Sequence, residues 1–191
     1  MASRAATIQG VRSVPLSLGL AIAVATVLAD SSVVVLALPD LLSSFDVSIE
    51  RVAWVITAFN LALAIAAVPA AYIAVRAGAG RVAAAGLACF AAASAVCAAA
   101  GNFDLLIAAR CVQAVSGAAV VCAALALMQD VSGSRARGAT AWAAAAAAGA
   151  AGGPAAGGAL TQAFTWRGVF AAQVPLAPGV VEAGEVRHPC E

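Results

Sequence analysis

Two ionisable side chains stand inside long apolar stretches of this chain, where burying a charge is energetically costly. Asp30 lies within residues 15–39 and Arg110 within residues 105–128. Within a bilayer each would cost a few kcal/mol unless it were paired or hydrated. Counting residues inward from the same side of the membrane gives the two side chains similar depths. We therefore expect them to form an ion pair or to share a water molecule.

Such a pair has two interpretations, and the residues alone favour neither. It could respond to protons, because protonating Asp30 would release Arg110 and shift the packing of the helices. It could equally be a structural pair that fixes two helices. Gln113 follows Arg110 at i+3 and shares its helix face, so it could hydrogen-bond the same partner or a substrate.

Residues 149–158 read GAAGGPAAGG inside another apolar run. On a helix, Gly149, Gly153 and Gly157 share one face and allow a second backbone to approach closely. Pro154 lacks an amide proton and predicts a bend. A bare, bent face suits two membrane helices that seal or rock against each other. The alternative is a drift toward alanine and glycine in a compositionally biased gene.

The elements that must position these residues are membrane helices. The chain is 64% hydrophobic and 10% charged, against about 25% charged in a soluble domain. Five stretches are long enough to cross a bilayer: residues 15–39, 52–75, 82–101, 105–128 and 139–163. A sixth, residues 169–181, has 13 residues and two prolines and is too short for a regular span. We expect an all-α, polytopic transmembrane helical bundle, since every span must satisfy its own backbone.

The placement of the ten arginines predicts the orientation. Arg4 and Arg12 precede the first span, and further arginines cluster in the second and fourth loops. This asymmetry predicts a cytoplasmic N-terminus. The first apolar run is longer than the core of a signal peptide and contains Asp30, so we expect it to be retained. The expected location is the cell membrane, as a bacterial inner or plasma membrane protein.

Composition also bears on partners and cofactors. Ten basic and nine acidic side chains give no reason to expect nucleic acid as a partner, whereas membrane lipid must surround the chain. Four cysteines lie within spans without a C-x-x-C pair, and the single histidine is His188. We therefore expect no metal and no cofactor. An enzyme is not expected either, because no histidine lies in a span to act as a base.

The order and spacing of these features resemble the N-terminal half of a major facilitator superfamily transporter, specifically the drug:proton antiporters of the fourteen-helix branch. Five segments carry the resemblance: LADSSVVVLALPDL, WVITAFNLALAIAAVPA, RCVQAVSGAA, the glycine stretch and TWRGVFAAQVP. The matching positions include Asp30, Pro39, Trp54, Pro69, Arg110, Gln113, Gly117, Gly149, Gly153, Pro154, Gly157, Gly158, Trp166, Arg167 and Pro175.

The resemblance implies roles for individual residues. Arg110 would take part in proton coupling with Asp30 and Gln113, and the glycines of residues 149–158 would bias the carrier toward antiport. The gating loop between the second and third spans would keep Arg76, Gly78 and Arg81. That loop departs from the family pattern, because Ala71 replaces a glycine and Val75 replaces an aspartate. Gln173 likewise replaces the usual asparagine.

These observations predict three regions: a cytoplasmic segment of residues 1–14, a six-helix half of a transporter over residues 15–178 with its last helix incomplete, and a polar tail of residues 179–191. The tail looks truncated or frame-shifted. The first hypothesis is proton-coupled efflux of drugs or other small apolar or cationic molecules by a half-unit, which would need a second copy or a separate second half. The alternative is a non-transporting membrane protein, either a degenerate remnant or an assembly subunit.

Overall fold

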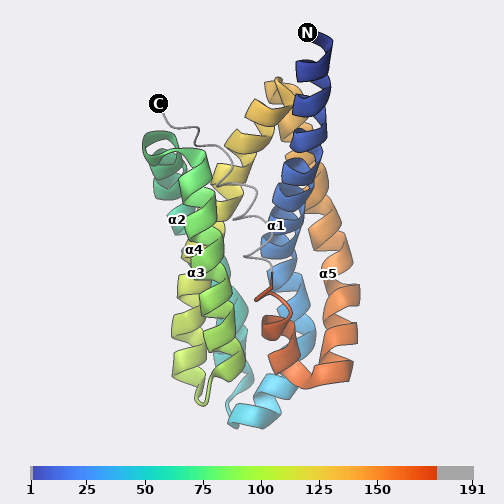
Figure 1. The fold of residues 1–191 in the computed structure, drawn as a ribbon. Helices are drawn as coiled ribbons and strands as arrows, with labels where there is room; N and C mark the ends of the chain where they lie inside the picture. Colours follow the sequence, from blue (N-terminus) through green and yellow to red (C-terminus); the bar gives the residue numbers. More distant parts are fainter. Residues whose placement is uncertain (1, 176–191) are drawn as a thin grey trace.

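The computed structural model describes residues 2–175 of the chain, with side chains from residue 16 onward. In that part all the regular secondary structure is helical, as expected. The helices are α1 (Ala2–Phe45), α2 (Ile49–Ala77), α3 (Ala79–Ala99), α4 (Phe103–Ser132) and α5 (Arg135–Ala171). They run up and down along one long axis (Figure 1).

Short polar or glycine-containing links set the helix ends. Ser48, Asn102 and Ser134 each stand before a helix and accept a hydrogen bond from a backbone N–H of its first turn. Gly133 ends α4 in the left-handed conformation with φ of 61°, which costs glycine little. Links of a few residues force neighbouring helices to be antiparallel, and this arrangement gives the bundle its topology.

Four helices are long and apolar enough to cross a membrane: residues 16–45 of α1, and the whole of α2, α3 and α4. The chain is therefore a multi-pass membrane protein in a lipid environment. The fifth predicted span, residues 139–163, lies within α5, whose many glycines make it less apolar; its crossing of the membrane stays a prediction. The first span does not end at Pro39 as the sequence suggested, because α1 continues to Phe45.

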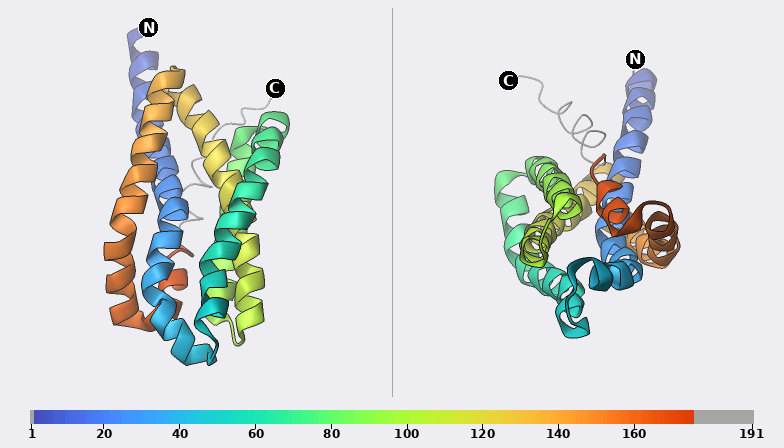
Figure 2. Two further views of the ribbon diagram at one scale, coloured as in Figure 1. Left: turned by 180° about the vertical axis from the view of Figure 1, so that it is seen from behind. Right: turned by 90° about the horizontal axis from the view of Figure 1, so that it is seen from below.

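The helices form two groups. The glycine-rich α5 packs along α1, while α2 and α3 both pack against α4. Viewed along the bundle axis in Figure 2, α1 and α5 lie on one side and α2 to α4 on the other. α4 also contacts α1 and α5 and so joins the two groups. The core between the groups is where Asp30 and Arg110 are buried.

The chain turns a corner at Thr165. Thr165 has φ of 62° and ψ of −177°, so α5 consists of a long helix up to Phe164 and a short helical segment from Trp166. We call residues 166–175 the returning segment. It runs back along the bundle between α1 and α3 (Figures 1 and 2). The predicted short sixth stretch begins inside it; residues 176–181 and the predicted tail of residues 179–191 lie outside the described residues.

Candidate functional site: a buried polar ring

Asp30 and Arg110 meet in the core as an ion pair. The Nη1 atom of Arg110 donates to Oδ2 of Asp30, and both side chains are fully buried, with exposed fractions of 0%. α1 supplies the carboxylate and α4 supplies the guanidinium. The pairing expected from their similar depths in the sequence is therefore present.

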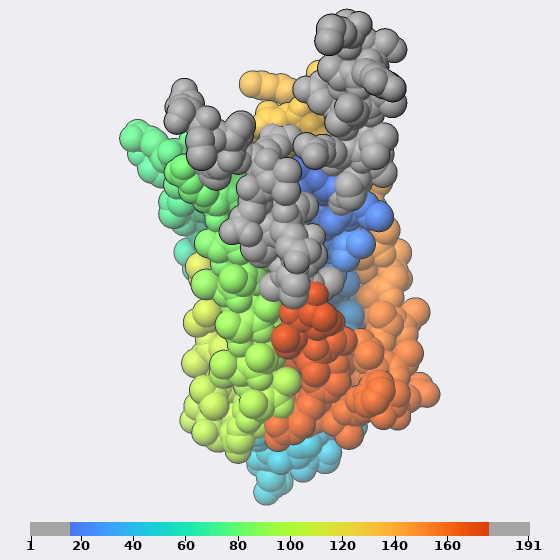
Figure 3. Space-filling view, in the orientation of Figure 1, coloured from blue at the N-terminus to red at the C-terminus, as the bar shows by residue number. Residues whose placement is uncertain are grey.

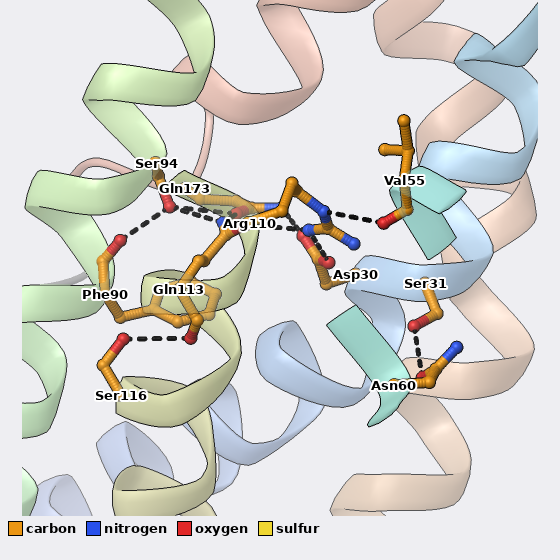
Figure 4. A network of polar contacts seen from close by, with 10 residues as sticks. All are labelled: Asp30, Ser31, Val55, Asn60, Phe90, Ser94, Arg110, Gln113, Ser116 and Gln173. Atoms are coloured by element: carbon orange, nitrogen blue, oxygen red, sulfur yellow. Dashed lines mark hydrogen bonds and ion pairs between the residues drawn. The ribbon is translucent and has the colours of Figure 1, made fainter. Parts of the chain in front are cut away.

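Two glutamines extend the pair into a closed ring (Figure 4). Arg110 Nη1 also donates to Gln113 Oε1 at 2.7 Å. Gln113 Nε2 donates to Gln173 Oε1 at 2.7 Å, and Gln173 Nε2 donates to Asp30 Oδ1 at 2.7 Å. We call Asp30, Arg110, Gln113 and Gln173 the polar ring. Its members come from α1, α4 and the returning segment, so it ties together three parts of the fold.

A serine of α3 joins the ring from the side. Ser94 Oγ accepts from Gln113 Nε2 at 2.7 Å and lies 3.2 Å from Gln173 Oε1. It also donates to the carbonyl of Phe90 at 2.8 Å. Since a hydroxyl has one proton and two lone pairs, Ser94 can accept from Gln113 while donating to one of these oxygens. The buried network therefore reaches α3 as well.

α2 contributes an aromatic face and a carbonyl to the arginine. The guanidinium carbon of Arg110 lies 4.0 Å from the ring centre of Phe59, within the range of a cation–π interaction. Arg110 Nε donates to the carbonyl of Val55 at 3.3 Å. Nη2 of Arg110 has no acceptor among the residues that the structure describes. The arginine thus retains donor capacity that a water molecule or a ligand could use.

Sequence reasoning found Asp30, Arg110 and Gln113 but assigned no role to Ser94 or Gln173. Each is a polar residue inside a short apolar run, AAASAV and FAAQVP. Buried polar side chains are almost always hydrogen-bonded. A single polar residue in an apolar run therefore predicts a buried hydrogen bond at Ser94 and at Gln173. It does not predict which residues are the partners.

The glycine face of α5 lies against α1. A Cβ added at Gly149 would overlap the backbone carbonyl of Ala25, and one at Gly157 would lie 2.8 Å from Val33 Cα. At Gly153 it would meet Ser32 Cβ at 2.9 Å. Gly158 is not part of this close contact, because its added Cβ would lie 3.5 Å from a side-chain atom of Leu36, an ordinary contact distance. The helix continues through Pro154.

The predicted gating-loop residues lie where α2 passes into α3. Gly78 takes φ of 92° between the two helices. The guanidinium of Arg76 packs over the ring of Tyr72 at 4.9 Å. Within the described part of the chain, neither Arg76 nor Arg81 forms an ion pair, and Val75 is 85% exposed. Among the residues that the structure describes, no carboxylate pairs with the two arginines of this loop.

Comparison with known proteins identifies related sequences over most of the chain. The family model described as Major Facilitator Superfamily matches residues 20–180. The methylenomycin A resistance protein of Bacillus subtilis is 34% identical over 150 residues, which are 77% of this chain and 32% of that protein. The multidrug efflux pump LfrA of Mycolicibacterium smegmatis is 33% identical over 160 residues, 82% of this chain and 32% of that protein. The chain thus spans about a third of the length of these two relatives.

A solved structure has the same fold. The chain superimposes with a TM-score of 0.73 on a bacterial homologue of the human lysosomal transporter Spinster, in an inward-facing and unoccupied conformation. The superposition covers 92% of this chain and 42% of that one, at 17% sequence identity. At this identity the likeness concerns the arrangement of the helices alone.

Proposed function

This chain belongs to the major facilitator superfamily, and we propose that it forms the N-terminal half of a proton-coupled efflux unit for drugs or other small apolar or cationic molecules. The superfamily consists of transporters, so the chain is part of a transport protein rather than an enzyme. The two relatives named for resistance and for multidrug efflux support the substrate class. Placement among the fourteen-helix drug:proton antiporters belongs to the same proposal, as do residence in the cell membrane and a cytoplasmic N-terminus.

The polar ring is the observation that carries the proposal. A buried carboxylate whose two oxygens accept from Arg110 and Gln173 is a site where one proton changes the charge of the core. Removing the negative charge of Asp30 would leave Arg110 without its counter-ion, which is strongly unfavourable in a low-dielectric interior. A helix rearrangement that hydrates the arginine would then be favoured. Such a change is what coupling of proton binding to transport requires.

The glycine face of α5 supports the proposal that efflux is coupled to protons without leak. Gly149, Gly153 and Gly157 bring the backbones of α5 and α1 together, and α1 carries Asp30. Tight packing of this kind leaves little room for water or ions to pass between the two helices. We therefore propose that this face limits leak while Asp30 changes its charge. We further propose that the loop with Arg76, Gly78 and Arg81 acts as a gating loop, which controls the conformational change of the transporter.

The alternative, a non-transporting remnant or assembly subunit, is favoured by one observation. The α2–α3 loop has the exposed Val75 at the position where the family pattern has a carboxylate, and neither Arg76 nor Arg81 has an acidic partner in the described chain. Without an ion pair between a carboxylate at position 75 and a neighbouring arginine, we expect the loop to control the conformational change of a transporter less well. Assembly with a second copy or with a separate second half is part of the first proposal, and is one way to complete the unit.

The test is efflux of a fluorescent cationic dye from cells that express this chain alone, with and without a protonophore. Membrane insertion is verified first. Efflux that stops when the protonophore is added would support proton-coupled transport by the assembled chain. No efflux from well-inserted chain would mean that a second half is essential, and that this chain alone is a fragment or remnant of a transporter.

The matched pair of variants is Arg110→Ala and Gln162→Ala. Arg110→Ala removes the cation of the polar ring and is expected to abolish protonophore-sensitive efflux while the protein remains inserted. Gln162 is an exposed polar residue of α5, so its replacement should leave efflux unchanged. Normal efflux by the Arg110 variant would contradict the coupling role.

A further inference from the structure

The hydrogen bonds of the polar ring form two paths that both begin at the donor Arg110 and both end at the acceptor Asp30. Arginine can only donate, and its Nη1 donates to Asp30 Oδ2 and to Gln113 Oε1. Because Gln113 turns its oxygen to the arginine, its Nε2 must donate onward, to Gln173. Gln173 in turn presents its oxygen to Gln113 and its Nε2 to Asp30. The ring is therefore complete only when both oxygens of Asp30 accept, as in the ionised carboxylate.

A proton on Asp30 cannot be accommodated by turning the amides. On Oδ1 the proton would face Gln173 Nε2, which is also a donor. Rotating the Gln173 amide would bring its Nε2 against Gln113 Nε2, and rotating Gln113 as well would bring donors against Arg110. A proton on Oδ2 would face Arg110 directly. In each of these arrangements two donors oppose each other, so one contact of the ring opens. A proton on a lone pair that the ring does not use leaves the contacts to a neutral acid, which accepts hydrogen bonds less strongly than a carboxylate.

Gln173 is the ring member that the helices hold least firmly. Asp30, Arg110 and Gln113 lie in the interiors of α1 and α4. Gln173 lies just beyond the last helical residue of the short segment that follows the corner at Thr165. At the surface of the molecule, the returning segment lies between α3 and α5 (Figure 3). Because the corner at Thr165 separates the segment from the long part of α5, a shift of residues 166–175 need not break that helix.

Three other contacts fasten the returning segment to its neighbours. Trp166 Nε1 donates to Ser44 Oγ of α1 at 3.1 Å. Arg167 donates to the carbonyls of Ala98 and Ala100, at the end of α3, at 2.6 and 3.1 Å. Phe170 of the segment lies with its ring centre 5.7 Å from the guanidinium carbon of Arg110, and Gln173 is the residue of the segment that hydrogen-bonds the carboxylate of Asp30. Trp166 is 3% exposed while the segment is docked, so it can report on undocking.

The titratable and charged groups facing Asp30 are few. From α4 there is Arg110, and from α3 the thiol of Cys97, which lies close enough to interact with both charges. α2 presents Phe59 and the Val55 carbonyl to Arg110, and neither titrates. Residues 138–164 of α5 contain no charged side chain, and Arg167 of the returning segment binds the α3 carbonyls. Asp30 is thus the carboxyl group whose protonation the ring detects.

We propose that Gln173 is a positioning residue that docks the returning segment against α1 while Asp30 is ionised and releases it when Asp30 is protonated. The proposal deepens the proposed function, because it rests on Asp30 as the proton-binding group. It adds the moving element, residues 166–175, and the side chain through which the charge acts. Gln173 does not itself bind the proton, and no covalent step is involved.

The experiment uses the chain with Trp166 as its one tryptophan, made by Trp54→Phe and Trp142→Phe, in lipid nanodiscs. Quenching of Trp166 by acrylamide is measured from roughly pH 2 to pH 9, a range that extends to both sides of the ordinary aspartate pKa of about 3.9. Low quenching at high pH is expected to rise through one transition as the pH falls. Gln173→Ala should be strongly quenched already at high pH, because losing a hydrogen bond to a charged group shifts the docking equilibrium at least about tenfold.

Two further variants make the result specific. Asp30→Asn should resemble Gln173→Ala at every pH, since an asparagine presents one donor group and so mimics the protonated acid. Gln173→Asn keeps the amide but shortens it by one methylene, so it should fold normally and still lose part of the transition. Gln162→Ala, on the exposed side of α5, should behave as the parent.

The proposal is overturned if Gln173→Ala keeps the amplitude and midpoint of the parent transition, or if the parent shows no change of quenching with pH. Should Gln173→Ala fail to fold, as judged by circular dichroism and size-exclusion chromatography, Gln173→Asn decides by the same criterion. The measurement does not need transport. A chain that shows the transition without dye efflux would therefore support the docking role and count against transport by this chain alone.

Discussion

The close contact of α5 with α1 gives the sharpest stability prediction, through two glycines three residues apart. A methyl group added at Gly149 would overlap the backbone of Ala25, whereas one at Gly152 has no atom within 4 Å. Both Gly→Ala changes gain about 1 kcal/mol of helix propensity, which cancels in their comparison. What remains is the overpacking at position 149, about 1–3 kcal/mol, because the backbone of α1 cannot move aside as a side chain can.

The assay is thermal unfolding of the purified chain in one detergent, followed by the fluorescence of its tryptophans. For a chain of this size the difference corresponds to a melting temperature roughly 2 to 12 °C lower for Gly149→Ala than for Gly152→Ala. Both variants should keep their helix content in circular dichroism. Equal melting temperatures would refute the close approach of the two backbones, and with it the role of the glycine face as a seal.

Three further changes test other parts of the structure. Arg110→Leu leaves the carboxylate of Asp30 buried without its cation and should lower the free energy of unfolding by about 3–5 kcal/mol, measured by denaturant titration; a double variant with Asp30→Leu as well should recover much of that loss, and no recovery would contradict the pairing. Thr165→Gly should raise the melting temperature, since Gly tolerates a φ of 62° that strains threonine by about 1 kcal/mol or more; a lower melting temperature would speak against the corner. Arg167→Ala should speed hydrogen exchange of the backbone amides at the end of α3, whose last carbonyls it caps; unchanged exchange would show that the caps contribute nothing there.

The helical fold and the central ion pair could be predicted from sequence because both follow from local rules. Long apolar runs in a bilayer have few alternatives to the helix. The depths of Asp30 and Arg110 follow from their distance to the span ends. The glycine face follows from the fourfold spacing of Gly149, Gly153 and Gly157, which needs no knowledge of the partner helix.

The remainder of the site depends on which segments the fold brings together. Gln173 contacts Asp30 across 143 residues, and Ser94 contacts Gln113 from another helix. No spacing rule encodes those meetings, because the first depends on the corner at Thr165 and the second on how α3 packs against α4. The end of α1 at Phe45, beyond Pro39, was missed for a different reason. A proline removes one backbone hydrogen bond and clashes locally, but tertiary packing can carry a helix past it.

The long separations within the polar ring also have a consequence for biosynthesis. The partner of Asp30 in the ion pair is made 80 residues later, and Gln173 only 143 residues later. While α1 is entering the membrane, its carboxylate has neither partner, and the arginine of α4 still lacks the glutamine network when it arrives. Asp30 must therefore stay hydrated, protonated or sheltered by the insertion machinery until α4 is made, and the pair lacks its contact with Gln173 until the returning segment emerges. A ribosome that stalls before residue 173 would leave an incomplete core for membrane quality control to recognise.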